Sequence, residues 1–170
     1  LQYDNVAVGN STLASLVSNT GKNVAIGSSA LNSNTTGEYN IAVGYGAGTG
    51  NTTGGYNIAI GLNTLQGTCT AQGVVAIGGY AVTANTSGAG ITGVGYAALS
   101  SNTTGNSNTA FGNASLASNT TGYSNTAVGR QALNKNTTGR ENVAIGYQSL
   151  YENTDGHVNV SIGEKALYSN

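Results

Sequence analysis

The chain has 170 residues, only 6% of them charged, and its formal net charge is −1. This balance excludes a basic surface for nucleic acid. No apolar run is long enough to span a membrane, and the single cysteine, Cys69, excludes a disulfide framework. We therefore expect partners other than nucleic acid and a mode of action other than membrane insertion.

A five-residue pattern, Asn-apolar-Ala-apolar-Gly, recurs along the whole chain and predicts a short β-strand in each copy. The ten predicted strands are Asn5–Gly9, Asn23–Gly27, Asn40–Gly44, Asn57–Gly61, Val74–Gly78, Ile91–Gly95, Asn108–Gly112, Asn125–Gly129, Asn142–Gly146 and Asn159–Gly163. The first two closing glycines are 18 residues apart, and all later ones are 17 apart. A period this short leaves no room for a helix in the repeat, so each copy predicts one coil of a parallel β-solenoid.

Each predicted strand is followed by a glycine corner, a second short segment and a turn. The second segment carries a small residue and then an apolar one, and the turn is most often Asn-Thr-Thr-Gly, as at Asn34 and Asn102. Two strands of about five residues plus two turns account for the repeat length. We expect an all-β solenoid of ten coils forming a single repeat domain over residues 1–170, with both ends cut within a repeat.

Side chains alternate between the two faces of a strand, so the fourth position, which is always large and apolar, is predicted to face the interior. This core ladder is Val8, Ile26, Val43, Ile60, Ile77, Val94, Phe111, Val128, Ile145 and Ile162. The third position is always small and is predicted to face outward, against a neighbouring chain or a closely packed second sheet. This oligomer-contact ladder is Ala7, Ala25, Ala42, Ala59, Ala76, Ala110, Ala127 and Ala144, with Gly93 at the same phase.

The leading Asn of the pattern occurs in eight of the ten copies. Stacked coils place equivalent residues about 4.8 Å apart, which allows side-chain amides to bond in a continuous row. The predicted Asn ladder is Asn5, Asn23, Asn40, Asn57, Asn108, Asn125, Asn142 and Asn159. The corner glycines are expected to supply positive φ angles or close packing.

The Asn-x-Ala-Ile-Gly string with glycine-bounded turns resembles the head repeat of trimeric autotransporter adhesins. It equally resembles the Asn-Thr-Thr-Gly repeats of phage and algal-virus tail fibres. The resemblance covers essentially the whole chain. It implies a left-handed roll, a homotrimer, and a place on a cell or virion surface. The adhesin-head repeat is shorter than the repeat found here, and the stalk, the anchor and the self-cleaving chaperone domain of such proteins are absent from this chain.

No residues are expected to act as catalytic, cofactor-binding or metal-binding groups. His157 is the only histidine and lies near Asp155 and Ser161, but in the turn region of a single repeat, so a solvated turn is the favoured interpretation. Gly44–Gly48 superficially resembles a phosphate loop, but no helix and no lysine follow it. Calcium-binding rolls carry an aspartate in every repeat, and this chain does not.

The ten tyrosines leave two interpretations open. They either lie partly buried over the corners or form an exposed aromatic strip for glycan contact. The Asn-Thr-Thr turns also match glycosylation sequons, which would matter only in a suitable secretory host.

The sequence favours a non-catalytic structural fibre or adhesin segment, extracellular or on a cell or virion surface. Its expected partners are copies of itself, in a homotrimer or by axial stacking, and a host-surface glycan or protein. A subunit of a head-to-tail extracellular filament is the second hypothesis. An ice-binding solenoid is the third, although the paired threonines are adjacent and their side chains should diverge.

Overall fold

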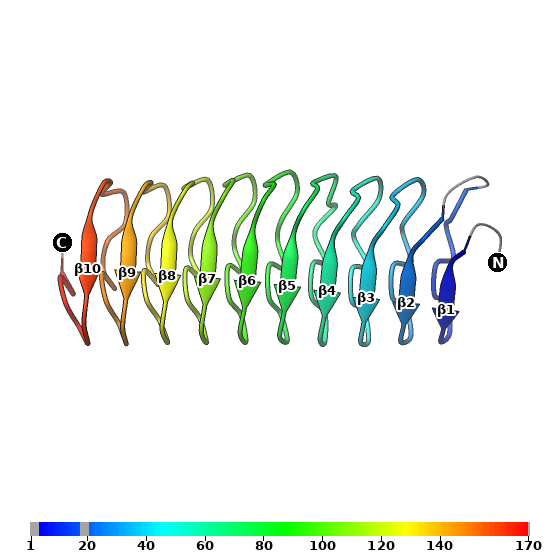
Figure 1. Cartoon of the computed structure of the whole chain (residues 1–170), viewed down its shortest axis with the longest axis horizontal. Helices are drawn as coiled ribbons and strands as arrows, with labels where there is room; N and C mark the ends of the chain where they lie inside the picture. The colour runs from blue at the N-terminus through cyan, green and yellow to red at the C-terminus, as the bar shows by residue number, and fades with distance from the viewer. Residues whose placement is uncertain (1–3, 18–20, 170) are drawn as a thin grey trace.

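The structure, a computed structural model, describes residues 4–17 and 21–169, and within them the only regular elements are ten parallel strands. The strands are β1 (Val6–Val8), β2 (Val24–Ile26), β3 (Ile41–Val43), β4 (Ile58–Ile60), β5 (Val75–Ile77), β6 (Thr92–Val94), β7 (Thr109–Phe111), β8 (Thr126–Val128), β9 (Val143–Ile145) and β10 (Val160–Ile162). They form one sheet in sequence order, one strand per coil (Figure 1). The predicted parallel β-solenoid is confirmed.

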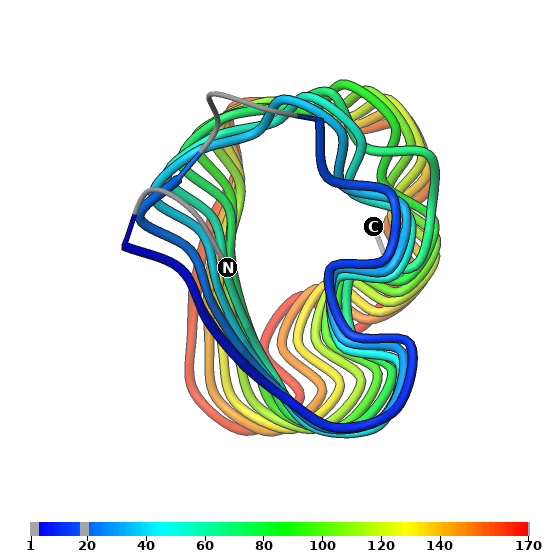
Figure 2. The ribbon, with the colours of Figure 1, turned by 90° about the vertical axis from the view of Figure 1, so that its right-hand side faces the viewer.

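Seen from the N-terminal end, the chain turns counterclockwise as it recedes, so the solenoid is left-handed (Figure 2). Each strand pairs with the equivalent residues of the next coil, for example Ile41 with Ile58 and Ala42 with Ala59. The repeat spacing is therefore also the hydrogen-bonding register of the sheet: 18 residues between β1 and β2, and 17 between all later neighbours.

The strands are shorter than expected, and the second segment of each coil is not a strand. Each strand has three residues, and the remainder of the coil is turns and bends whose backbone groups bond to the next coil. Left-handed backbone conformations bend this part of the chain. They recur at residues such as Ser29 (φ 60°), Leu31 (φ 48°) and Tyr39 (φ 59°). Several sharp bends within one coil leave no extended stretch for a second sheet.

The predicted inside and outside of the strand are reversed in the structure. The alanines proposed for oligomer contact are interior: Ala25, Ala42, Ala59, Ala76, Ala110, Ala127 and Ala144 are buried, and Ala7 is half-buried. The proposed core ladder is on the surface: Val8, Ile26, Ile60, Phe111, Ile145 and Ile162 are exposed, and Val43, Ile77, Val94 and Val128 are half-buried.

The reversal follows from the narrowness of the coil, in which the strand faces the apolar residue of the corner at close range. Gly93 occupies the strand position that is alanine in most coils, and a Cβ atom added to it would lie 2.6 Å from Cγ2 of Val82. Gly48 occupies the corner position that is leucine in most coils, and a Cβ atom added to it would lie 2.9 Å from Cδ2 of Leu31 and 3.6 Å from Cβ of Ala42. The interior therefore accommodates one leucine per coil only if the opposing strand residue is small, so the larger Val and Ile side chains must point outward.

The predicted Asn ladder is confirmed, and it lies on the same inward face as the alanines. In its regular part, each Asn donates from its backbone N and its side-chain Nδ2 to Oδ1 of the Asn one coil earlier. Asn142, for example, donates to Asn125 Oδ1 at 3.1 and 3.0 Å, and its Nδ2 also donates to the Gly156 carbonyl at 2.8 Å. In the two copies without Asn, Val74 and Ile91 take its place as buried apolar residues.

A second buried Asn ladder runs through the Asn-Thr-Thr-Gly segments, for which the sequence predicts only a turn. Its members are Asn34, Asn51, Asn85, Asn102, Asn119, Asn136 and Asn153. Asn119 Nδ2 donates to Asn102 Oδ1 at 2.7 Å and to the Gly122 carbonyl of its own turn at 2.9 Å. Among the described residues, no buried side-chain nitrogen or oxygen lacks a partner. The sequon amides at 34, 51, 85, 102, 119 and 136 are thus enclosed within the folded solenoid.

Glycine is required at the corners for two reasons, as Gly44 illustrates. Its φ is 133°, and a Cβ atom there would lie 2.5 Å from the carbonyl oxygen of Gly61 in the next coil. Any side chain would therefore force the coils apart and would also be strained in this backbone conformation.

We expect Asn125→Ala to lower the free energy of unfolding by about 3 kcal/mol, because it leaves several buried hydrogen-bonding groups without a partner. Asn125 accepts from Asn142 and donates to Asn108 Oδ1 and the Gly139 carbonyl. Urea unfolding followed by circular dichroism measures the change. Asn113→Ala, at an exposed asparagine, is the control and should change the value by less than about 0.5 kcal/mol.

A second pair of variants tests the orientation of the strand. Ala127→Leu should destabilise the fold by about 1–3 kcal/mol, because Ala127 is fully buried and the interior has no room for a larger side chain. Val128→Thr should cost less than about 1 kcal/mol, because Val128 is half-exposed and threonine suits a strand surface. The opposite order in urea melts would place the alanines outside.

Candidate functional site

The outward side chains of the strands form one continuous surface, which we call the outer sheet face. It consists of the first and third residues of each strand from β1 to β10. Its residues are Val6, Val8, Val24, Ile26, Ile41, Val43, Ile58, Ile60, Val75, Ile77, Thr92, Val94, Thr109, Phe111, Thr126, Val128, Val143, Ile145, Val160 and Ile162. The face carries no charge, and apart from three threonines it is entirely apolar.

The outer sheet face is accessible along its whole length. In the central coils Ile60 is 37% exposed and Phe111 is 57% exposed, although both belong to paired strands. Monomeric soluble proteins rarely leave a contiguous apolar surface of more than a few hundred Å² uncovered. A face of ten strands at about 4.8 Å spacing is more than 40 Å long. This surface has the chemistry of a contact between protein chains.

The tyrosines are mostly on the surface, which favours the exposed-strip interpretation over partial burial. Tyr45 and Tyr56 are each 61% exposed, and Tyr96 is 58% exposed. Tyrosines at the same or adjacent repeat positions of successive coils contact one another. The rings of Tyr80 and Tyr96, for example, meet edge to face with 5.7 Å between their centroids.

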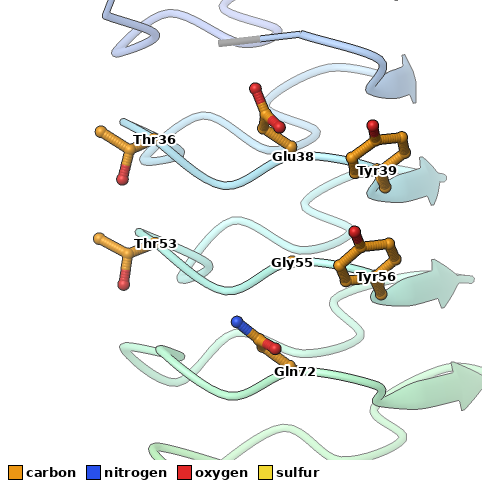
Figure 3. A pocket seen from close by; sticks show the side chains of 7 residues that line it. All are labelled: Thr36, Glu38, Tyr39, Thr53, Gly55, Tyr56 and Gln72. Atoms are coloured by element: carbon orange, nitrogen blue, oxygen red, sulfur yellow. The ribbon is translucent and has the colours of Figure 1, made fainter.

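A groove lies beside the stacked pair Tyr39 and Tyr56, whose ring centroids are 4.9 Å apart with an angle of 4° between the planes. It has a volume of about 210 Å³ and is lined by Thr36, Glu38, Tyr39, Thr53, Gly55, Tyr56 and Gln72. Figure 3 shows three columns, with the threonines on one side, the tyrosines on the other, and Glu38, Gly55 and Gln72 between them. Gly55 contributes no side chain to the middle column, and an added Cβ atom there would lie 3.1 Å from the Glu38 carbonyl oxygen.

Several of the few charged side chains contact residues one coil away, because equivalent positions are adjacent in a parallel stack. Lys135 forms an ion pair with Glu152 at 2.8 Å, and this hydrogen bond raises the pKa of Lys135. Arg130 lies over the ring of Tyr147, with 5.5 Å between its Cζ and the ring centroid. Such solvent-exposed contacts contribute little to the stability of the fold.

The residues near His157 do not assemble into a catalytic site. His157 is exposed, and its Nδ1 lies 3.5 Å from the backbone oxygen of Asp155. The Ser161 hydroxyl points into the interior and donates to the Ala166 carbonyl at 2.8 Å. Among the described residues no cluster of three or more His, Cys, Asp or Glu is placed to hold a metal ion. In Gly44–Gly48 the chain forms the ordinary corner of a coil and no helix follows.

Cys69 is buried, and its sulfur takes the place of an Asn oxygen in the second Asn ladder. Asn85 Nδ2, which would otherwise donate to an Asn one coil earlier, lies 3.7 Å from Cys69 Sγ. Burial raises the pKa of the Cys69 thiol above its usual value. The substitution keeps the interior filled where the regular ladder is interrupted.

The paired threonines of the turns do not present a double array. The first hydroxyl of a pair is used internally: Thr103 Oγ1 donates to the Thr120 carbonyl at 3.0 Å, and Thr120 Oγ1 to the Thr137 carbonyl at 3.0 Å. Only the second threonine, such as Thr104 or Thr121, is fully exposed. This single column gives no support to the ice-binding hypothesis.

Comparison of the chain with protein-family models, curated proteins and solved structures found no match. The resemblance to adhesin heads and tail fibres therefore stays a prediction. No helix of the described residues has the length and apolarity needed to cross a membrane.

We expect Cys69 to react slowly with a disulfide reagent such as DTNB while the protein is folded. The thiol is buried and its raised pKa reduces the fraction of reactive thiolate at pH 8. One thiol per chain should react at once in guanidinium chloride. Equal rates in the two conditions would contradict the burial of Cys69.

Proposed function

We propose that this chain is a non-catalytic structural and adhesive segment of a fibre on a cell or virion surface, and that it assembles laterally as a homotrimer. The outer sheet face is the observation that carries the proposal. It replaces the alanine ladder, which is interior, as the surface through which the copies meet.

The proposal is supported by the way in which apolar residues are divided between the interior and the surface. The interior of a typical coil holds one leucine, small residues and two asparagines, whereas the larger Val and Ile side chains of the strand are outside. Burying apolar area contributes about 25 cal/mol per Å², so an isolated coil leaves the exposed part of its Val and Ile side chains without this stabilisation. Packing the outer sheet faces together would recover it.

Copies of the chain itself are the best-matched occupants of this face. Every coil presents the same short apolar strand at the same axial spacing, so two copies in register meet with matching rows along their whole length. The outer sheet face carries no charge, so a partner does not need the opposite charge to bind it. An irregular partner could not match a row of ten equivalent positions equally well.

The two Asn ladders support a mechanical role. Each coil is tied to the next by backbone bonds of the strand, by side-chain amides, and by threonine hydroxyls. Force applied along the axis is therefore carried by many parallel bonds in every coil. This is the property required of a rod that holds a binding surface away from the cell or particle.

Sedimentation of the unmodified chain is expected to give three times the 16.8 kDa chain mass. Ile77→Lys combined with Val94→Lys should convert the trimer to monomers. Each of the three chains would bring two lysines into the interface, where no carboxylate is present to pair with them. Thr104→Lys with Thr121→Lys, which adds the same charge in an exposed turn, should leave the trimer intact.

Lateral assembly through the outer sheet face would be refuted if the unmodified chain is a monomer. It would also be refuted if the variant with Ile77→Lys and Val94→Lys keeps the mass of a trimer. Mass that grows with concentration, together with unbranched threads in electron micrographs, would favour the head-to-tail filament instead.

A further inference from the structure

The groove beside Tyr39 and Tyr56 combines an open aromatic ring with unused polar side chains. We infer that it binds a neutral saccharide, with a pyranose ring packed on the free face of Tyr56. The inference deepens the adhesive part of the proposed function and rests on it. It uses residues outside the outer sheet face.

One face of the Tyr56 ring is free because of the residues at the same position in the coils before and after it. Lys22 lies over the ring of Tyr39 with its Nζ 4.7 Å from the centroid, and Tyr39 in turn stacks on Tyr56. In the next coil the equivalent residue is Gly73, where an added Cβ atom would meet nothing within 4 Å. The stack therefore ends at Tyr56, with one ring face uncovered above a glycine.

Polar groups surround this ring at positions where ring hydroxyls could meet them. Gln72 belongs to the coil that carries Gly73, and Thr53 and Glu38 line the groove on the other side of Gly55 (Figure 3). Among the described residues, none forms a hydrogen bond with the side chains of Thr36, Thr53, Glu38 or Gln72. The groove therefore offers hydroxyl and amide groups that are free to bond, together with the Glu38 carboxylate, whose charge also acts on the nearby Lys22.

This combination fits a saccharide better than other small ligands. The C–H face of a pyranose packs on an aromatic ring, while its hydroxyls need both donors and acceptors around the edge. The groove volume of about 210 Å³ is of the order required by one or two sugar rings. Glu38 is the only charged lining residue, and its carboxylate disfavours an acidic sugar.

The test is saturation-transfer NMR and titration of the whole chain with a panel of probes. The panel contains the methyl glycosides of galactose, mannose and N-acetylglucosamine, their trisaccharides, and sialyllactose as an acidic probe. At least one neutral probe should bind, and sialyllactose should bind more weakly than the neutral probes. Tyr56→Ala should weaken binding of that neutral probe about tenfold, the effect of losing an aromatic contact.

Tyr45→Ala is the matched control, because Tyr45 has the same 61% exposure as Tyr56 but does not line the groove. It should leave affinity within a factor of about two. Gly73→Tyr is the sharper variant. Its backbone φ of 67° is close to the 59° that Tyr39 and Tyr56 already adopt, so a third tyrosine can continue the stack. It should abolish binding while the melting temperature stays the same or rises.

Three results would overturn the inference: no neutral probe binds, Tyr56→Ala binds as well as the unmodified chain, or Gly73→Tyr folds and still binds. The trimer is tested separately, because none of these variants alters the outer sheet face. A trimer without saccharide binding would refute this site alone, and a monomer that binds saccharide would refute lateral assembly alone.

Discussion

Stacked asparagine side chains are the interaction on which this structure depends. In the regular part of the ladder, each interior amide accepts two hydrogen bonds from the next coil and donates to the coil before it and to a glycine carbonyl. An unpartnered buried amide would cost about 1–3 kcal/mol, so a coil displaced by one residue would lose several such bonds at once. Where the ladders are continuous, they therefore fix the register between successive coils and favour a constant period.

The ladders also occupy space, and the space that remains determines the surface. With two asparagines and one leucine inside a typical coil, only alanine or a similarly small residue fits on the inward side of the strand. The larger β-branched residues are consequently displaced to the outside. An apolar outer face is thus a direct consequence of a narrow polar interior, and it gives the chain a reason to associate.

A parallel stack turns each exposed position into a column, so a single exceptional residue creates a local feature. Gly73 ends the column of stacked tyrosines, and Gly55 contributes no side chain to the groove beside them. The same geometry places Lys135 against Glu152 and Arg130 over Tyr147, each pair 17 residues apart. A regular rod can therefore carry distinct sites without any insertion.

The sequence alone determined the period, the parallel stacking, the first Asn ladder and the glycine corners, because these depend on spacing and on local backbone chemistry. It could not determine which strand face is interior. Alternation separates Ala127 from Val128 but does not say which of them meets the leucine of the corner. Only the closed coil brings Leu133 and the turn asparagines into the interior, and only stacked coils join Tyr39, Tyr56 and Gly73 in one place. Those features depend on which segments of a coil face one another. The spacing of the repeat does not specify this, and so the tertiary structure decided them.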